Sequence, residues 1–174
     1  MLTSPAHPSG TDRVGEIAAR PEFASFDSIV NVQGDAPFLP REALTGALVQ
    51  LEKFAIGTAA TRLLPSEADD LATVKVVIGL DGTARAFSRG FLPGAANWRH
   101  LGLYAFTRPA LERLVSEPPT APETSQALEQ LRAVALGLSI GVATVMEPVG
   151  PAVDTQADLE EARAYWTTRN EVTR

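Results

Sequence analysis

The sequence predicts an α/β domain with a mostly parallel sheet and one inserted β-hairpin. Predicted strands and helices alternate along the chain, which favours parallel strands joined by helical crossovers. Asp81-Gly82 separates two β-rich runs, and this dipeptide suits the positive φ angles of a tight hairpin turn. The 174 residues show no internal repeat and no break in composition, so we expect one domain spanning 1–174.

The first part of the chain begins in a loop rich in Pro, Gly and Ser. Helices are indicated by apolar residues at helical spacing, and Pro40 suits a helix start. Ser66 and Asp69 have the spacing of a capping box for a short helix. The predicted segments are a loop over 3–11, a helix over 12–20, a buried strand over 28–33, a helix over 40–53 and a strand over 56–64.

The second part contains the hairpin and the remaining elements. Gly137 is the expected stop of a long helix, and Thr155 with Asp158 forms a capping box for the last one. The predicted segments are hairpin strands over 74–79 and 83–89, a strand over 100–106, a short helix from Pro109, a helix over 123–136, a strand over 139–145 and a final helix after Thr155.

Composition excludes several classes of function. The formal charge of −6 argues against a nucleic-acid binder. With no Cys, the chain has no disulfides and no thiolate chemistry. We find no membrane-length apolar run, no signal peptide, no P-loop, no G-x-G-x-x-G and no H-E-x-x-H, and therefore expect a cytoplasmic protein without a membrane or nucleic-acid partner.

Asp35 and Asp154 are the candidate metal ligands. Each follows a predicted strand, and ligands of open α/β sheets bind beyond the carboxyl ends of strands. Two carboxylates there suit Mg²⁺ held against phosphates. The alternative is that each caps a helix or a turn.

Polar residues elsewhere are candidate substrate contacts. Ser9 to Arg13 form a polar loop that enters a helix N-terminus, where an anion can bind, although ordinary capping also explains them. Glu129 and Gln130 suit a polyol, or simply form a solvated helix face. Arginine binds carboxylates in a bidentate manner, so the candidates for an acidic substrate are Arg89, Arg99, His100 and Arg132, unless they are surface ion pairs and a structural histidine.

Seven segments, taken in order, resemble one enzyme family. They are HPSGTDRV (7–14), IVNVQGDAP (29–37), VKVV (74–77), AFSR (86–89), RHLGLYAF (99–106), LEQLR (128–132) and VDTQADLE (153–160). The set is collinear, covers nearly the whole chain and resembles the 3-deoxy-manno-octulosonate cytidylyltransferases, or CMP-Kdo synthetases.

The resemblance implies a Rossmann-like nucleotidyltransferase fold, a homodimer, a need for Mg²⁺, and the conversion of CTP and 3-deoxy-D-manno-octulosonate (Kdo) to CMP-Kdo and pyrophosphate for lipopolysaccharide synthesis. It assigns Asp35 and Asp154 to the metal and to catalysis. It places Ser9, Gly10 and Arg13 near the nucleotide. The family's sugar-acid residues match Gln33, Arg89, Arg99, His100, Tyr104, Glu129 and Gln130.

The matching motifs lack the family's opening portion, which carries the first strand and a loop that grips the CTP phosphates. We therefore expect an N-terminally truncated fold with a weakened nucleotide half. Two alternatives stay open: a synthetase for another sugar acid, such as an amino-Kdo or a sialic acid, and a non-catalytic remnant that serves as a dimerisation or binding module.

Overall fold

The computed structural model describes residues 1–146 and 149–172. Its strands are β1 (Ser28–Val32), β2 (Ile56–Arg62), β3 (Lys75–Ile78), β4 (Ala84–Ser88), β5 (Asn97–Thr107) and β6 (Ile140–Val145). Its helices are α1 (Gly10–Ala18), α2 (Arg41–Gln50), α3 (Arg108–Ser116), α4 (Ala121–Gln126), α5 (Gln130–Ala135) and α6 (Gln156–Val172), with short 3₁₀ turns η1 (Pro21–Phe23) and η2 (Pro65–Glu67).

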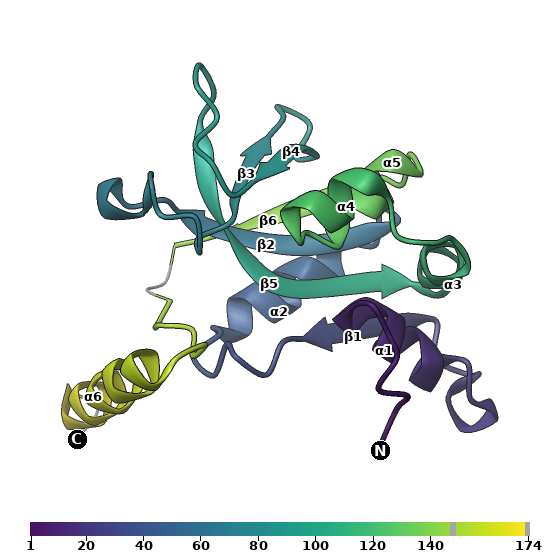
Figure 1. Ribbon diagram of the computed structural model, residues 1–174, viewed down its shortest axis with the longest axis horizontal. Helices are drawn as coiled ribbons and strands as arrows, with labels where there is room; N and C mark the ends of the chain where they lie inside the picture. The colour runs from purple at the N-terminus through teal and green to yellow at the C-terminus, as the bar shows by residue number, and fades with distance from the viewer. Residues whose placement is uncertain (147–148, 173–174) are drawn as a thin grey trace.

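The described strands form one six-stranded mixed sheet. Its order is β4-β3-β5-β2-β6, and β1 also pairs with β5. The long strand β5 therefore lies at the centre (Figure 1), with β2 along one edge and β3 followed by β1 along the other. This confirms the α/β class and the inserted hairpin, whose turn residue Gly82 has φ +82°.

The prediction of a mostly parallel sheet is wrong for these strands. Four of the five pairings in the described sheet are antiparallel, and only β2 with β6 is parallel. A parallel connection needs a long crossover, usually a helix. Between β2 and β5 the chain contains only the three-residue turn η2 and the hairpin, so β5 returns antiparallel to its neighbours.

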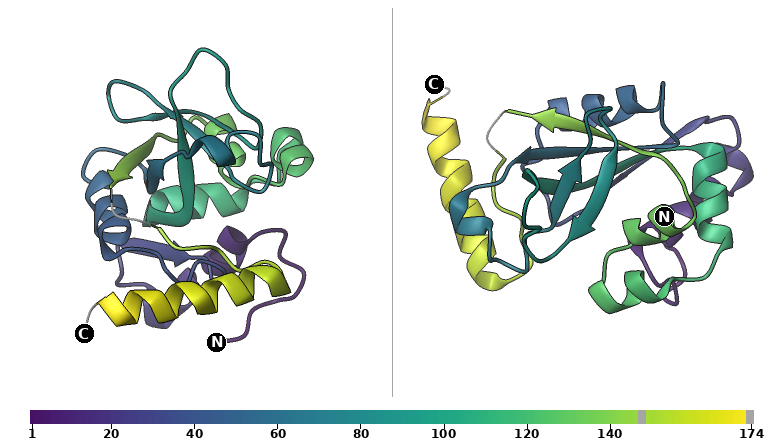
Figure 2. Two further views of the ribbon diagram at one scale, coloured as in Figure 1. Left: turned by 90° about the vertical axis from the view of Figure 1, so that its left-hand side faces the viewer. Right: turned by 90° about the horizontal axis from the view of Figure 1, so that it is seen from above.

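Helices cover both faces of the sheet. On one face, α2 packs its buried Ala43 and Ala47 against β2, β5 and β6. On the other face, residues of α1, α3 and α5 share a core with Tyr104 and Phe106 of β5. Alternate residues of β5 thus serve opposite layers, as the two-residue period of a strand requires. Figure 2 shows α2 and the α4–α5 pair on opposite sides of the sheet.

Two local predictions are wrong. The predicted helix over 123–136 is broken into α4 and α5, because Ala127 adopts a left-handed conformation with φ +51°. No helix begins at Ser66; instead, the Glu67 carboxylate accepts a hydrogen bond from the backbone N–H of Leu64 and closes η2. Gly137, with φ +70°, does follow α5 as expected.

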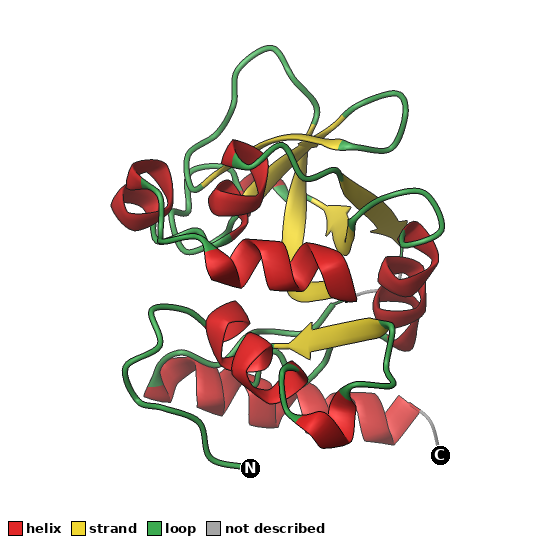
Figure 3. Cartoon of the chain, turned by 90° about the vertical axis from the view of Figure 1, so that its right-hand side faces the viewer, coloured by secondary structure: helices red, strands yellow, loops and turns green. Residues whose placement is uncertain are grey.

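The last helix, α6, lies at the periphery of the molecule (Figure 1). Phe38 packs against Tyr165 and Trp166 of this helix, with ring centroids 4.8 and 6.4 Å apart. Figure 3 shows that the loops joining β3 to β4 and β4 to β5 project from one end of the molecule. Among the described helices, none has the length and apolar character needed to cross a bilayer.

Candidate functional site

One cavity of about 950 Å³ collects side chains from distant parts of the chain. It is bounded by the loop before α1, the loop after β1, the end of β4, the first half of β5, the start of α5 and the segment before α6. Of the thirteen predicted site residues, Arg13 and Arg132 lie outside it and eleven line it: Ser9, Gly10, Gln33, Asp35, Arg89, Arg99, His100, Tyr104, Glu129, Gln130 and Asp154. Residues that are far apart in the sequence therefore line the same cavity.

The two predicted metal ligands lie on adjoining loops. The backbone N–H of Val153 donates to the carbonyl of Asp35 at 2.8 Å, which joins the loop after β1 to the segment carrying Asp154. The Oδ1 atom of Asp35 is buried and has no partner among the described residues. A buried, unpartnered carboxylate oxygen is costly, so a cation or a water there would remove a real penalty.

The same region has no larger metal cluster. Within residues 1–146 and 149–172, no group of three or more His, Cys, Asp or Glu is placed to hold a metal ion. Asp158 also lines the cavity, but its carboxylate accepts from the N–H groups of Asp154 and Thr155 and caps α6. These hydrogen bonds, led by that from Thr155, lower the pKa of Asp158. The chain thus offers a pair of carboxylates, Asp35 and Asp154.

The start of α1 is already partly occupied by the chain's own side chains. Ser9 is the N-cap, and its Oγ accepts from the Asp12 N–H at 3.2 Å. The Thr11 N–H donates to Glu129 Oε2 at 3.1 Å. This loop therefore caps α1 in the ordinary way and also lies beside the cavity. Arg13 lies outside the cavity, exposed, and contacts the first residues of the chain.

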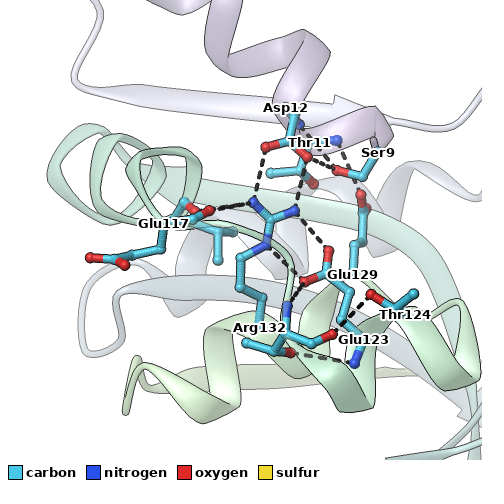
Figure 4. A network of polar contacts seen from close by, with 10 residues as sticks. Ser9, Thr11, Asp12, Glu117, Glu123, Thr124, Glu129 and Arg132 are labelled. Atoms are coloured by element: carbon cyan, nitrogen blue, oxygen red, sulfur yellow. Dashed lines mark hydrogen bonds and ion pairs between the residues drawn. The ribbon is translucent and has the colours of Figure 1, made fainter. Parts of the chain in front are cut away.

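Arg132 is a buried structural residue, and its predicted role as a substrate contact is wrong. It is 1% exposed and pairs with two carboxylates, Asp12 at 2.9 Å and Glu123 at 2.7 Å (Figure 4). Hydrogen bonding to Asp12 raises the pKa of Arg132. Burial raises the pKa of Asp12, but the bonds from Arg132 and Ser9 outweigh it and hold that pKa below its usual value. The network joins the loop before α1 to α4 and α5.

The two cavity arginines are both held in place. Arg99 donates to Glu67 Oε1 at 2.9 Å. Arg89 donates to the backbone carbonyls of Leu71, Gln126 and Ala127. Carbonyls leave the charge of Arg89 unneutralised, so Arg89 is the cavity arginine best placed to attract a substrate carboxylate.

His100 and Tyr104 sit three and seven residues into β5, and both are buried. The ring of His100 lies between Phe87 and Tyr104, with centroids 5.2 and 5.4 Å away. Burial lowers the pKa of His100 to about 4, so the ring is neutral near pH 7. Burial, and secondarily the charge of Glu129, raises the pKa of Tyr104 well above 10. Both groups therefore act as neutral hydrogen-bonding partners.

Gln33 reaches the cavity because the residue opposite it is glycine. Its backbone N–H donates to the carbonyl of Gly102, and its side chain lies across that glycine. A Cβ on Gly102 would overlap Gln33 Oε1 and come within 3.1 Å of its Cδ. On the opposite wall, Gln130 is 5% exposed and Glu129 Oε1 is buried with no partner among the described residues.

Sequence reasoning missed residues whose importance depends on distant partners. Buried Lys75 donates to the carbonyls of Asp70 and Arg89 and so anchors the wall that carries Arg89. Thr58 contacts His100 from the neighbouring strand. No local pattern marks either residue. The carboxylates that line the cavity also outnumber its arginines: Asp35, Glu67, Asp70, Glu123, Glu129, Asp154, Asp158 and Glu161 against Arg89 and Arg99.

Comparison with known proteins gives consistent matches. A family model described as cytidylyltransferase matches residues 1–140. A 3-deoxy-manno-octulosonate cytidylyltransferase of Gemmatimonas aurantiaca is 44% identical, over 95% of this chain and 69% of its own length. That of Polynucleobacter asymbioticus is 40% identical, over 94% of this chain and 69% of its own length.

A solved structure agrees with the sequence matches. It is a CMP:2-keto-3-deoxy-manno-octonic acid synthetase complexed with CTP, 32% identical, with a TM-score of 0.85 over 97% of this chain and 72% of that chain. The fold and the cavity thus define a nucleotidyltransferase of the cytidylyltransferase class. The chain belongs to the 3-deoxy-manno-octulosonate cytidylyltransferase family.

Proposed function

We propose that this chain activates Kdo with CTP, forming CMP-Kdo and pyrophosphate. The observation that carries the proposal is the convergence of eleven predicted residues, from separate segments of the chain, on one cavity. In the reaction, the hydroxyl oxygen on the anomeric carbon of Kdo bonds to the α-phosphorus of CTP. The bond from that phosphorus to the bridging oxygen breaks, pyrophosphate leaves, and the hydroxyl proton is released.

We further propose that Asp35 and Asp154 hold Mg²⁺. The unpartnered Oδ1 of Asp35, the joined loops and the excess of cavity carboxylates all fit a hard divalent cation. When bound, the ion would offset the charge of the triphosphate and of the leaving pyrophosphate. Glu67 and Glu123 are paired with Arg99 and Arg132, but without a cation the other six cavity carboxylates would repel both anionic substrates.

The remaining residues would bind and orient the substrates. Arg89 and Arg99 suit the sugar carboxylate, and Glu129 and Gln130 suit sugar hydroxyls. Ser9 and Gly10 lie at the side of the cavity proposed for the nucleotide, and Arg13 is left out because it lies elsewhere. Catalysis would then rest mainly on positioning and electrostatics.

The test is pyrophosphate release by the chain with CTP, Mg²⁺ and Kdo. We expect Asp35→Asn to lower the rate by about 100-fold or more, which is the loss typical of removing one electrostatic contact from an active site. Asp27→Asn is the matched control, since Asp27 is exposed and outside the cavity, and it should leave the rate unchanged. Full activity of Asp35→Asn would remove that residue from the metal site.

Two alternatives have their own readouts. A panel of sugar acids that includes an amino-Kdo and a sialic acid identifies the preferred substrate. The non-catalytic remnant is favoured by one observation, the occupied N–H groups of Thr11 and Asp12 at the start of α1. Calorimetry with CTP and Mg²⁺ separates it from the enzyme: micromolar binding by this chain contradicts the remnant, and no binding contradicts the synthetase.

We also propose the homodimer and the cytoplasmic location that the sequence led us to expect. The homodimer is supported by the family resemblance alone. Size-exclusion chromatography with light scattering tests it, and a mass of 18.5 kDa at all concentrations would contradict it.

A further inference from the structure

An irregular pairing between β2 and β5 brings Thr58 and His100 together. Thr58 is opposite Tyr104, but the next residue, Ala59, is opposite Leu101, so β5 has two extra residues at this point. Such a bulge disrupts the ladder of backbone hydrogen bonds. The Thr58 hydroxyl compensates by donating to the carbonyl of Leu103 at 2.7 Å.

This hydrogen bond determines where the proton of His100 lies. A hydroxyl has one hydrogen, and a carbonyl can only accept. The hydrogen of Thr58 Oγ1 is therefore directed at Leu103, and the oxygen must accept from His100 Nε2, which is 2.9 Å away. In the opposite tautomer, the lone pair of His100 Nε2 would face a lone pair of Thr58 Oγ1 across that distance, and the two would repel each other.

The other ring nitrogen is then an acceptor open to the cavity. His100 is neutral near pH 7 because of its burial. Its Nδ1 makes no hydrogen bond to a described residue. The described side-chain atoms that are both fully buried and unpartnered are Asn31 Nδ2, Asp35 Oδ1 and Glu129 Oε1, so Nδ1 is not sealed off from solvent. Since His100 lines the cavity, Nδ1 can reach a ligand there.

We propose that Thr58 is a positioning residue that holds His100 in the tautomer protonated on Nε2, so that Nδ1 accepts a hydrogen bond from a hydroxyl group of the sugar acid. This rests on the proposed function and deepens it, since it assigns His100 to a hydroxyl. A lone pair on Nδ1 repels a carboxylate, so the carboxylate of the sugar acid binds to the cavity arginines instead.

Nitrogen-15 NMR of the imidazoles tests the tautomer without any need for turnover. The chain has only two histidines, so the spectrum of the His7→Gln variant contains imidazole signals from His100 only. We expect one tautomer near pH 7, protonated on Nε2, and a mixture in Thr58→Val. Thr58→Ser, which keeps the hydroxyl, should restore the single tautomer. A proton on Nδ1, or an unchanged spectrum in Thr58→Val, overturns the proposal.

Ligand titration tests the recognition step. Added Kdo should shift the Nδ1 resonance of His100, and no shift at saturating Kdo overturns the assignment. In the synthetase assay, Thr58→Val should raise KM for Kdo about tenfold while KM for CTP stays unchanged, and Thr58→Ser should restore it. Equal changes in both KM values point to a merely structural role and overturn the proposal.

If pyrophosphate is not released with any sugar acid, the proposed function fails, whereas the NMR tautomer and the Nδ1 shift on Kdo binding still decide the role of Thr58.

Discussion

Arg132 illustrates how much one buried side chain contributes at the scale of the residue. It is the shared partner of Asp12 and Glu123, whose side chains are 9% and 8% exposed. Removing one member of a buried ion network leaves uncompensated charges, which is more costly than the network is stabilising. Its position also connects the loop at Ser9 with the helix that begins after Glu129.

We predict that Arg132→Met lowers the free energy of unfolding by about 3–5 kcal/mol, because two buried carboxylates lose their cation. Urea denaturation followed by circular dichroism measures this loss. The matched control is Arg85→Met, which removes an exposed pair with Asp81 and should cost less than about 1 kcal/mol. Similar losses in both variants would contradict the structural role of Arg132.

His100 should make stability depend on pH. Its pKa is about 4 in the folded protein and near 6.5 when unfolded, so below pH 6.5 the unfolded state binds the extra proton. Stability is therefore complete above that value and falls as pH drops toward 4, by about 2 kcal/mol between pH 7 and pH 5. Thermal or urea unfolding across this range measures the slope.

The control for that slope is His100→Gln. A glutamine amide can still donate to Thr58 but does not titrate, so we expect a shallower loss over the same interval. The lowered pKa of Glu16, about 2, also makes stability fall at acid pH, but it contributes equally to both proteins. Parallel slopes would show that His100 is not buried in the neutral form.

At the scale of the element, the junction where β5 passes from β3 to β1 shapes the cavity wall. Gly102 lies at this junction and leaves room for the side chain of Gln33. We predict that Gly102→Ala raises KM for Kdo several-fold with little loss of stability, since only the flexible end of Gln33 must move. Steady-state kinetics together with a melting temperature measures both effects.

Gly34→Ala is the matched control, because a Cβ there would meet no heavy atom within 4 Å. It should leave both quantities unchanged. If Gly102→Ala destabilises the protein strongly and leaves KM for Kdo intact, Gln33 is not a substrate contact.

At the scale of the whole molecule, ligands should clamp loops that are far apart in the sequence. The cavity is formed by segments from Pro8 to Glu161, so a ligand that spans it binds the folded state alone. We predict that CTP with Mg²⁺, at a concentration of 100 times Kd, stabilises the fold by about 2.7 kcal/mol. Differential scanning fluorimetry measures this as a rise in Tm.

That stabilisation should depend on the proposed metal ligands. Asp154→Asn should lose most of the rise in Tm, whereas an unliganded melt should be unaffected because Asp154 is exposed. A full rise in Tm for Asp154→Asn, or for CTP with a chelator present, would contradict a metal-dependent site.

Local sequence was sufficient for most elements and for the candidate site. Helical spacing, turn residues and caps act within a few positions, so the hairpin at Gly82 and the cap at Thr155 were predictable. The site residues were predictable because polar groups that follow strands, and the family's motifs, are visible along the chain. These residues line one cavity, except Arg13 and Arg132.

Long-range packing sets the direction of β5, the break at Ala127, the burial of Arg132 and the tautomer of His100. Each depends on a partner tens of residues away or on how segments pack, and periodicity carries no information about such pairings. The order of residues along the chain is therefore enough to show which side chains are available for the chemistry. Packing decided which of them are free to bind a ligand, because burial and pairing occupy the rest.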